Sequence, residues 1–387
     1  MPESPQRIAI LGATGSIGGS ALEVVAASQG RLQVAGLTAH SRLTFLLEQA
    51  QRFRPAWIIG TDETVAQSFD WTGAPPACVV KRGMDAVIEA VASPDVDVVL
   101  AAMVGSAGLH ATWAALAAGK TVALANKETL VMAGGLVTAL ARRTGATIVP
   151  VDSEHSAVWQ ALQAGRRAEV RRIVLTASGG PFLRHSCEQL SNVTVEEALA
   201  HPTWTMGRKI TVDSATMMNK ALEIIEARWL FDLDVDQIGV VIHPQSLIHG
   251  LVEFVDGSIV AQMSCPDMRL PIQYALNYPE RREQVSTPFD WSRATSLTLE
   301  PPDEERFPAL RLGREAARVG GTAGAVLNAA NEAAVAGFLE GELRFNEIVP
   351  ACERVLGHHD FDPNPTLDDL IRLDRWAREE VVRWACA

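Results

Sequence analysis

Short apolar runs alternate with helix-patterned segments over the first 150 residues, and this alternation restricts the fold more than any other feature of the chain. The apolar runs have the length of buried strands, and the segments between them repeat apolar residues every three or four positions, as helices do. Strands and helices in this order form a parallel sheet wrapped by helices. The sequence therefore predicts an N-terminal Rossmann domain, residues 1–150, with strands near 8–11, 32–39, 56–60, 96–103, 120–126 and 146–151.

The first apolar run enters a glycine-rich turn. Residues 8–18 are IAILGATGSIG, with glycines at positions 12, 15 and 18, and a helix-patterned segment begins at Ser20. A strand, a glycine turn and a helix in this order place the amides of the helix start against a phosphate group. Because the G-x-x-G-x-x-G spacing differs from the commoner G-x-G-x-x-G pattern, a ligand-free turn capped by Thr14 and Ser16 is the alternative. We favour a cofactor site.

The end of the second predicted strand bears on which cofactor binds. An acidic residue there binds the ribose 2′-hydroxyl of NAD, whereas a small or basic loop admits the 2′-phosphate of NADP. The chain has Thr38-Ala-His-Ser-Arg42 at this point and no acidic residue before Glu48. Because His40, Ser41 and Arg42 can donate hydrogen bonds, we predict NADP, with Arg42 as the expected partner of the phosphate. The alternative is that Arg42 faces solvent.

The pattern changes after residue 150. Residues 151–285 mix strand-like runs with helices and polar motifs, which predicts an α+β domain, and residues 286–310 carry prolines and charged clusters typical of a linker. Residues 311–387 show apolar residues at three- and four-residue spacing, as a small helical bundle requires. The predicted fold class is α/β, with an N-terminal Rossmann domain, a central α+β catalytic domain and a C-terminal helical bundle.

Length, charge and cysteine content exclude several classes of protein. A chain of 387 residues divides into two or three domains, and its net charge of −12 argues against a nucleic-acid partner, so local cations or a metal must hold any anionic substrate. No segment is typical of a membrane span or an export signal, so we expect a cytoplasmic protein. The cysteines lack a C-x-x-C pair, which disfavours a disulfide framework or a structural zinc site; they are Cys78, Cys187, Cys265, Cys352 and Cys386.

Two carboxylates follow the last predicted strand of the first domain, in the run VDSEHSA. In an extended chain residues two apart point the same way, so Asp152 and Glu154 can face one spot. Two adjacent negative charges favour a divalent cation, and magnesium or manganese with substrate oxygens in its open positions is the expected arrangement. The alternative is that both acids cap a helix that begins near Ser156, and capping and coordination can coexist.

The segment His201–Ala227 carries the highest density of chemically active side chains. Ser214, Asn219 and Lys220 offer hydroxyl, amide and ammonium donors suited to a phosphate dianion. Glu223 follows Lys220 by three residues on one predicted helix face, so a third carboxylate can join the metal. The alternative for these two residues is an ordinary surface ion pair.

Ser178 follows another predicted strand in the run TASGGPF. The two glycines after it let a backbone approach an anion closely, so this serine is a candidate phosphate ligand. A plain turn explains the same residues almost as well.

Several long motifs occur in a fixed order along the chain: GATGSIG, ALANKETLV, VDSEHSA, ASGGPF, HPTWTMGRKITVDSATMMNKALE, VIHPQSLIHG and NAANEAAV. On these motifs the chain closely resembles the 1-deoxy-D-xylulose 5-phosphate reductoisomerase family over nearly its whole length. The resemblance implies an NADP-binding domain at 1–150, a catalytic and dimerisation domain at 151–285, a linker at 286–310 and a helical domain at 311–387.

The resemblance also implies roles for individual residues, carried over by position. The metal ligands are Asp152, Glu154 and Glu223. The substrate-binding residues are Ser153, Ser178, His201, Ser214, Asn219, Lys220 and Glu223. The catalytic set is Lys127, Glu154, His155, His201, Trp204 and Met206, with residues 201–209 as a closing loop and His249 as a further active-site histidine. The cofactor-binding residues are Gly12, Thr14, Gly15, Ser16, Ile17, Gly18, His40, Ser41, Arg42, Asn126, Lys127, Glu128, Gly207, Pro266 and Met268.

The activity that the resemblance implies is the isomerisation and NADPH-dependent reduction of 1-deoxy-D-xylulose 5-phosphate to 2-C-methyl-D-erythritol 4-phosphate, in the non-mevalonate pathway of isoprenoid synthesis. It implies magnesium or manganese, with cobalt as a further candidate, a sugar-phosphate substrate, no nucleic-acid or membrane partner, and a homodimer. Metal-bound water, Glu154 and Lys127 each stay a candidate for moving the proton. The alternatives are a simple NADP-dependent dehydrogenase and a redox-sensing protein that binds NADPH without turnover; the three carboxylates and the phosphate donors disfavour both.

Overall fold

The computed structural model describes residues 4–385, so the terminal residues, Cys386 among them, lie outside the described residues. The chain divides into two compact units. The first comprises Met1–Thr129, Val137–Ser156 and Asp267–Pro288; the second comprises Leu130–Leu136, Ala157–Pro266 and Phe289–Ala387.

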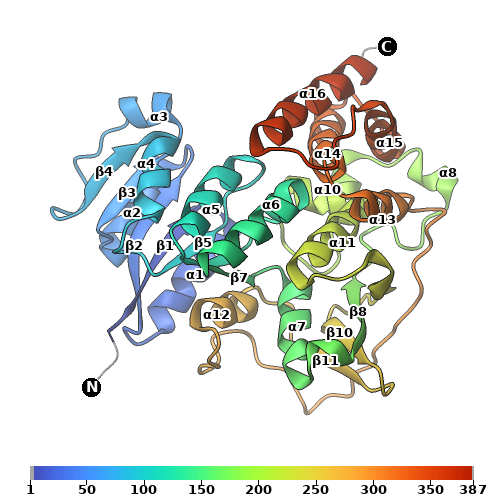
Figure 1. Cartoon of the computed structure of the whole chain (residues 1–387), viewed down its shortest axis with the longest axis horizontal. Coiled ribbons are helices and arrows are strands. Elements are labelled where there is room, and N and C mark those ends of the chain that lie inside the picture. The colour runs from blue at the N-terminus through green and yellow to red at the C-terminus, as the bar shows by residue number, and fades with distance from the viewer. Residues whose placement is uncertain (1–3, 386–387) are drawn as a thin grey trace. The chain divides into compact units, whose positions relative to one another are not determined.

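A seven-stranded sheet forms the centre of the first unit, and its strands pair in parallel (Figure 1). The strand order is β4-β3-β2-β1-β5-β6-β7. The bounds are β1 (Gln6–Leu11), β2 (Leu32–Ala39), β3 (Trp57–Gly60), β4 (Val79–Arg82), β5 (Val98–Ala101), β6 (Thr121–Leu124) and β7 (Thr147–Pro150). The order reverses direction at β1, so the crevice between the carboxyl ends of β1 and β5 is where a parallel α/β sheet binds its ligand. The predicted Rossmann fold is confirmed.

Helices connect these strands and bury apolar side chains. They are α1 (Ser16–Ala27), α2 (Leu43–Phe53), α3 (Glu63–Ser68), α4 (Gly83–Val91), α5 (Ala107–Ala117) and α6 (Glu128–Thr144). A late segment returns to this unit, because α12 (Arg269–Asn277) packs against α1. Helix α6 is broken at Ala133, where φ is −131° and ψ is 25°, just before two successive glycines.

A four-stranded mixed sheet belongs to the second unit, with the order β11-β10-β8-β9. Its strands are β8 (Val170–Ala177), β9 (Ile238–Ile242), β10 (Ile248–Phe254) and β11 (Ile259–Met263). Strand β8 pairs in parallel with β9, while β10 is antiparallel to both β8 and β11. The helices in this part of the chain are α7 (Ser153–Ala161), α8 (Cys187–Leu190), α9 (Val195–Leu199), α10 (Arg208–Thr216) and α11 (Met218–Phe231). The mixed sheet confirms the predicted α+β texture.

The C-terminal part of the second unit is helical, as predicted, with α13 (Ala309–Val319), α14 (Ala323–Glu340), α15 (Ile348–His358) and α16 (Leu367–Ala385). Helix α14 is rich in alanine, a strong helix former, and it contacts α10, α11, α13, α15 and α16. Small residues permit close crossings here, since a Cβ added to Gly313 of α13 would lie 2.6 Å from Ala221 Cα of α11. Within residues 4–385, no helix combines the length and apolar character that crossing a membrane requires.

Candidate active site

The glycine turn joins β1 to α1 in a conformation that needs its glycines. Gly12 has φ +82°, and a Cβ on it would lie 2.5 Å from the carbonyl oxygen of Ala102. A Cβ on Gly18 would lie 2.4 Å from the carbonyl oxygen of Gly12, so the helix start packs directly on the turn. Gly15 is the N-cap of α1, and no side chain caps this helix. The alternative of a turn capped by Thr14 and Ser16 is therefore wrong, and the amides at the start of α1 are left for an anion.

The loop after β2 exposes His40, Ser41 and Arg42. The Arg42 guanidinium donates a hydrogen bond to the carbonyl oxygen of Thr14 and thus lies against the glycine turn. His40 Nδ1 lies 3.2 Å from Thr61 Oγ1, and its Nε2 lies 3.8 Å from a carboxylate oxygen of Asp62. Asp62 comes from the end of β3, so the sequence order could not reveal an acid beside this loop.

Asn126, which follows β6, forms hydrogen bonds to the loop after β5 and to the start of α6. Asn126 is 2% exposed, and its Nδ2 donates to the carbonyl oxygens of Met103 and Gly105, at 2.7 and 3.0 Å. The same amide group donates to Glu128 Oε2 at 2.7 Å. Asn126 and Glu128 therefore fix the loop after β5 to the start of α6, at the carboxyl edge of the sheet, where a dinucleotide binds in this fold.

Asp152 and Glu154 stand where β7 ends and α7 begins. The helix begins at Ser153, so the expectation that both acids lie in extended chain, with a helix only from near Ser156, is wrong. Glu154 lies in the first turn of α7, where the helix dipole favours a negative charge. Capping geometry and metal coordination are compatible, as expected from the sequence. Ser153 donates a hydrogen bond to the Glu154 carboxylate.

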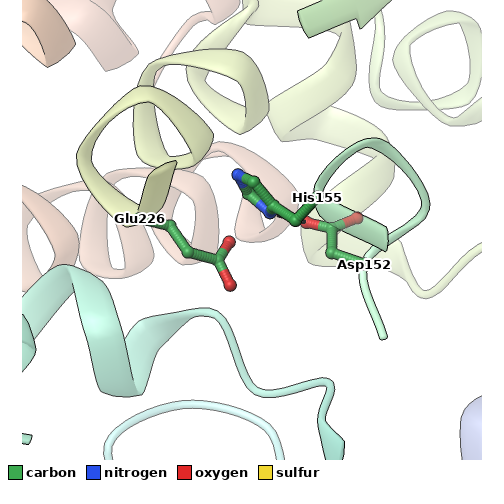
Figure 2. Close-up of side chains that lie close together, drawn as sticks. All are labelled: Asp152, His155 and Glu226. Carbon is green, nitrogen blue, oxygen red and sulfur yellow. Dashed lines mark ion pairs between the residues drawn. The ribbon is translucent and has the colours of Figure 1, made fainter. Parts of the chain in front are cut away.

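Lys127 neutralises the first of these carboxylates. Its Nζ lies 2.6 Å from Asp152 Oδ2, and the two side chains are only 8% and 14% exposed. His155, fully buried, places its Nδ1 3.7 Å from the same oxygen (Figure 2). Burial opposes the charge on Asp152, but the Lys127 ammonium and His155 outweigh it and hold the pKa of this carboxyl below its usual range. Asp152 is thus ionised at neutral pH, as a metal ligand must be.

The second unit contributes a buried polar cluster on α11. Glu223 is fully buried, and it accepts hydrogen bonds from Asn219 Nδ2 at 2.6 Å and from the Lys220 ammonium. Lys220 is itself 3% exposed, so the alternative of an ordinary surface ion pair is wrong. A buried carboxylate paired with an amide and an ammonium is a costly arrangement that is usual at functional sites.

Ser178 and the loop that begins at His201 are linked. His201 Nδ1 accepts hydrogen bonds from the backbone amides of Thr203 and Trp204, at 3.1 and 2.9 Å. In the neutral ring its Nε2 then carries the proton and donates to Ser178 Oγ, 3.0 Å away. Burial lowers the pKa of His201 from its ordinary value of 6.5. The Trp204 indole packs edge-on against the ring of His249, with centroids 6.2 Å apart.

Helix α10 connects this loop to the cluster on α11. It begins after Gly207, its N-cap, and ends where Met217 adopts a left-handed conformation, φ +63°, that turns the chain into α11. Ser214 lies in its last turn and is half-buried. Gly180 packs on this helix so closely that a Cβ on it would lie 2.7 Å from the Ser214 carbonyl oxygen. Ser178, Ser214, Asn219 and Lys220 thus come from adjoining segments of one unit.

The segment around Met268 is held by a residue that sequence reasoning missed. Asp267 accepts hydrogen bonds from the Arg269 guanidinium, with Nη2 at 2.6 Å, and from the Thr287 amide at 2.9 Å. Burial opposes its charge, but the hydrogen bonds to Arg269 and Thr287 hold the pKa of Asp267 well below its usual range. Met268 packs against the core of the first unit. Pro266 is the last residue of the segment Ala157–Pro266, which belongs to the second unit.

The donor chemistry of these residues fits the groups expected from the sequence. Three carboxylates, Asp152 and Glu154 in the first unit and Glu223 in the second, are the hard oxygen ligands that magnesium and manganese prefer. The glycine turn offers unpaired helix amides to a pyrophosphate, and the second unit offers hydroxyl, amide and ammonium donors to a phosphate. The individual roles of these residues stay predictions.

Three models of known protein families match the chain. The model described as 1-deoxy-D-xylulose 5-phosphate reductoisomerase matches residues 8–134, and two models of C-terminal domains of that enzyme match residues 148–231 and 263–380. Among curated proteins named 1-deoxy-D-xylulose 5-phosphate reductoisomerase, that of Thermomicrobium roseum is 51% identical over 96% of this chain and 95% of its own length. That of Geobacter metallireducens is 49% identical over 97% of this chain and 98% of its own.

Solved structures give the same result. A reductoisomerase of this name from Zymomonas mobilis, in complex with NADPH, superimposes with a TM-score of 0.91 at 42% identity and covers 98% of this chain and 99% of its own. A DOX-P reductoisomerase in complex with NADPH, fosmidomycin and magnesium superimposes with a TM-score of 0.92 at 42% identity, over 98% of each chain.

Proposed function

Because the chain belongs to the 1-deoxy-D-xylulose 5-phosphate reductoisomerase family, we propose that it converts 1-deoxy-D-xylulose 5-phosphate to 2-C-methyl-D-erythritol 4-phosphate with NADPH and a divalent metal ion. The reaction rearranges a ketose phosphate to a branched aldehyde and then reduces it. The observation that carries the proposal is the near-full-length similarity, about half the residues being identical, to curated proteins of that name. The NADPH and magnesium in solved relatives support both cofactors.

The first unit is proposed to bind NADPH. The helix amides beside Gly15 hold the pyrophosphate, Arg42 and its neighbours hold the 2′-phosphate, and Asn126 and Glu128 keep the adjoining loops in place. NADPH supplies the hydride for the reduction. The cofactor roles of Arg42, His40 and Ser41 rest on their exposure and donor chemistry beside the glycine turn.

Asp152, Glu154 and Glu223 are proposed to ligate magnesium or manganese, with cobalt as a further candidate. A divalent cation supplies positive charge for the oxyanion that develops on the substrate. Lys127 holds Asp152 ionised through a contact of 2.6 Å, and its ammonium is a candidate proton donor together with Glu154. His155 packs behind the same carboxylate.

The phosphate of the substrate is proposed to bind Ser178, Ser214, Asn219 and Lys220. His201 donates to Ser178 and folds the loop through the amides that follow it, so the loop and the phosphate ligands are coupled in one network. Trp204 and Met206 then cover the carbon chain of the substrate, which excludes water from the reacting fragments.

We further propose that the protein is a cytoplasmic homodimer. Strand β11 is an edge strand of the mixed sheet, and Ile259 on it is 60% exposed, which leaves an apolar edge available to a second copy. Cys78, Cys187 and Cys352 are free thiols, as a reducing compartment requires. Light scattering of the purified protein tests the dimer, and a monomer at micromolar concentration contradicts it.

Product identification tests the function directly. After incubation with 1-deoxy-D-xylulose 5-phosphate, NADPH and magnesium, carbon NMR should show the branched skeleton of the product. An unbranched polyol phosphate would indicate the simple dehydrogenase, and bound but unconsumed NADPH would indicate the binding protein.

The variant Glu223→Gln tests the metal site. It removes one negative ligand, so turnover at ordinary magnesium should fall to background while the affinity for NADPH stays nearly unchanged. Glu253→Gln is the matched control, because Glu253 is also buried but pairs with Arg171 and Arg172 on the mixed sheet. Activity of the Glu223 variant within a factor of a few of the wild type would overturn the assignment.

A further inference from the structure

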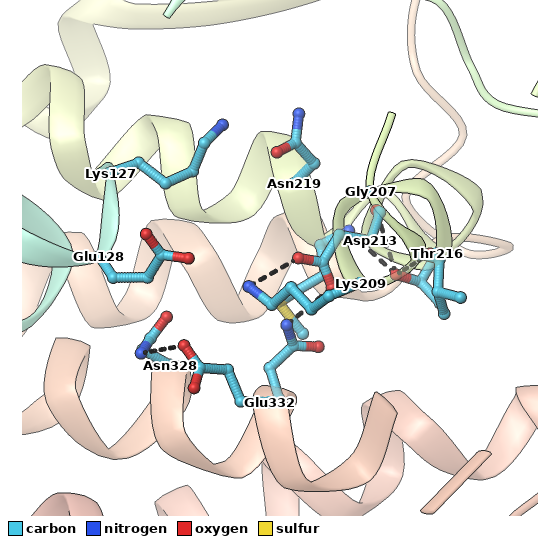
Figure 3. A network of polar contacts seen from close by, with 12 residues as sticks. Lys127, Glu128, Gly207, Lys209, Asp213, Thr216, Asn219, Asn328 and Glu332 are labelled. Carbon is cyan, nitrogen blue, oxygen red and sulfur yellow. Dashed lines mark hydrogen bonds and ion pairs between the residues drawn. The ribbon is translucent and has the colours of Figure 1, made fainter. Parts of the chain in front are cut away.

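A buried carboxylate lies one residue before Ser214, outside the set of residues assigned above (Figure 3). Asp213 is 1% exposed, and its Oδ1 accepts a hydrogen bond from Asn331 Nδ2 of α14 at 2.8 Å. Its Oδ2 lies 2.8 Å from the Nζ of Lys209, four residues earlier on α10. A charge at this depth is tolerated only when such partners hold it.

Asn331 is committed to this contact. It is fully buried, and a carboxylate only accepts hydrogen bonds, so the amide nitrogen must face Asp213. The amide oxygen then points away and has no hydrogen-bond partner anywhere in residues 4–385. A buried oxygen without a partner is unfavourable, and a well-packed apolar pair in place of the two side chains would avoid that penalty. Stability alone therefore does not explain this pair.

The position of Asp213 and Asn331 in the fold offers a better explanation for their pairing. Successive residues of an α-helix are rotated by about 100° around its axis. Fixing Asp213 against α14 on the buried side therefore fixes the direction in which the Ser214 side chain leaves the helix. Ser214 is half-buried, and its backbone contacts Gly180 of the loop that follows Ser178. The same helix leads through Met217 into α11, which carries Asn219 and Lys220.

We propose that Asp213, held by Asn331 and Lys209, is a positioning residue for the substrate phosphate. It acts through α10, whose rotation it sets, and it does not touch the substrate. This inference rests on the proposed function, in which Ser214 and its neighbours bind that phosphate. It gives the motif NAANEAAV, in the C-terminal helices, a role in substrate binding through its second asparagine.

The test compares two ligands that differ only in the phosphate: the proposed substrate and its dephosphorylated form, the free sugar 1-deoxy-D-xylulose. For Asp213→Asn, KM for the phosphorylated substrate should rise about tenfold or more, while kcat and KM for NADPH change by less than about threefold. Inhibition by the free sugar should stay within about twofold of the wild-type strength, because this sugar makes no phosphate contact. The double variant Asp213→Asn, Asn331→Asp restores an amide–carboxylate pair and should recover most of the lost affinity.

Glu332→Gln is the control for a purely structural effect. Glu332 follows Asn331 on α14 and is largely buried, with its side chain 15% exposed. Its carboxylate pairs with Arg378 Nη2 at 2.6 Å and with Asn328 Nδ2 at 3.1 Å, both within the C-terminal helices. This variant should lower the melting temperature without changing KM for the substrate. If Asp213→Asn behaves like Glu332→Gln, the inference is wrong.

A second control separates the inference from the function on which it rests. Ser214→Ala should weaken binding of the phosphorylated substrate and leave binding of the free sugar unaffected. If Ser214→Ala discriminates between the two ligands and Asp213→Asn does not, Asp213 has no positioning role although the phosphate site stands. If neither variant discriminates, the proposed phosphate site itself is wrong.

Discussion

Replacing Gly12 by alanine should weaken NADPH binding. Gly12 has φ +82°, a conformation that costs an alanine about 1–2 kcal/mol. The new Cβ would lie 2.5 Å from the carbonyl oxygen of Ala102, whereas ordinary contact begins at 3.4 Å, so backbone must move by about 0.9 Å. The two groups that would have to move apart are both main chain, the glycine turn and the carbonyl of Ala102, so no flexible side chain can relieve the clash. The same turn positions the amides proposed to bind the pyrophosphate. A displacement of about 1 Å in a positioned group costs up to about 100-fold, so we expect the affinity for NADPH to fall about 10- to 100-fold.

Fluorescence titration with NADPH measures this effect, and Gly19→Ala provides the matched control. Gly19 lies in α1, in the same glycine-rich segment, but a Cβ on it meets no atom within 4 Å. Alanine is a better helix former than glycine by about 0.5–1 kcal/mol, so this variant should bind NADPH normally and melt slightly higher. The reasoning is refuted if Gly12→Ala binds NADPH within twofold of the wild type, or if Gly19→Ala loses binding to the same degree.

Two further predictions follow from pKa shifts. The pKa of Asp267 is lower in the folded protein than in the unfolded chain, so the stability that its ionised carboxylate contributes is present above about pH 5 and is lost as the pH falls. Asp267→Asn should therefore lower the free energy of unfolding at pH 7 by about 1.5–3 kcal/mol. The difference in melting temperature between variant and wild type should narrow towards pH 3, and an unchanged difference would contradict this prediction. The lowered pKa of His201 keeps the imidazole ring neutral at pH 7. When the ring is protonated, at a pH below its ordinary pKa of 6.5, Nδ1 carries a proton and can no longer accept hydrogen bonds from the amides of Thr203 and Trp204. KM for the substrate should therefore rise at acidic pH. His201→Asn retains an acceptor for these amides but does not titrate, so its KM should be higher than that of the wild type at pH 7 and should lack this pH dependence.

The elements predicted well from the sequence are those whose signals are local. The β1 strand, its glycine turn and α1 lie within one short segment, and the C-terminal helices carry strong periodicity. Strand β4 (VVKR) was missed because half of its residues are charged, and helix α3 (ETVAQS) was missed because six residues are too few for a helical periodicity. The expected extended geometry at Asp152 and Glu154 was wrong for a related reason, since packing and not propensity decides where β7 gives way to α7.

Contacts between distant parts of the chain were beyond sequence reasoning. The residue types of the candidate site are visible in the motifs, but their contacts depend on how the elements pack. Examples are the ion pair of Lys127 with Asp152 and the hydrogen bonds that Asp267 accepts from Arg269 and Thr287. Asp213 and Asn331 are 118 residues apart, and their contact exists only because α14 packs on α10. The one signal that the sequence offered was an acidic residue directly before a predicted phosphate ligand.

The most direct test of the account is the consumption of NADPH by the purified protein. With 1-deoxy-D-xylulose 5-phosphate and magnesium, absorbance at the reduced-nicotinamide band should fall only when the substrate is present. The loss should stop when a chelator is added and should be weak with NADH. No loss of NADPH with any divalent metal would contradict the central claim and leave only the dinucleotide-binding fold of the first unit.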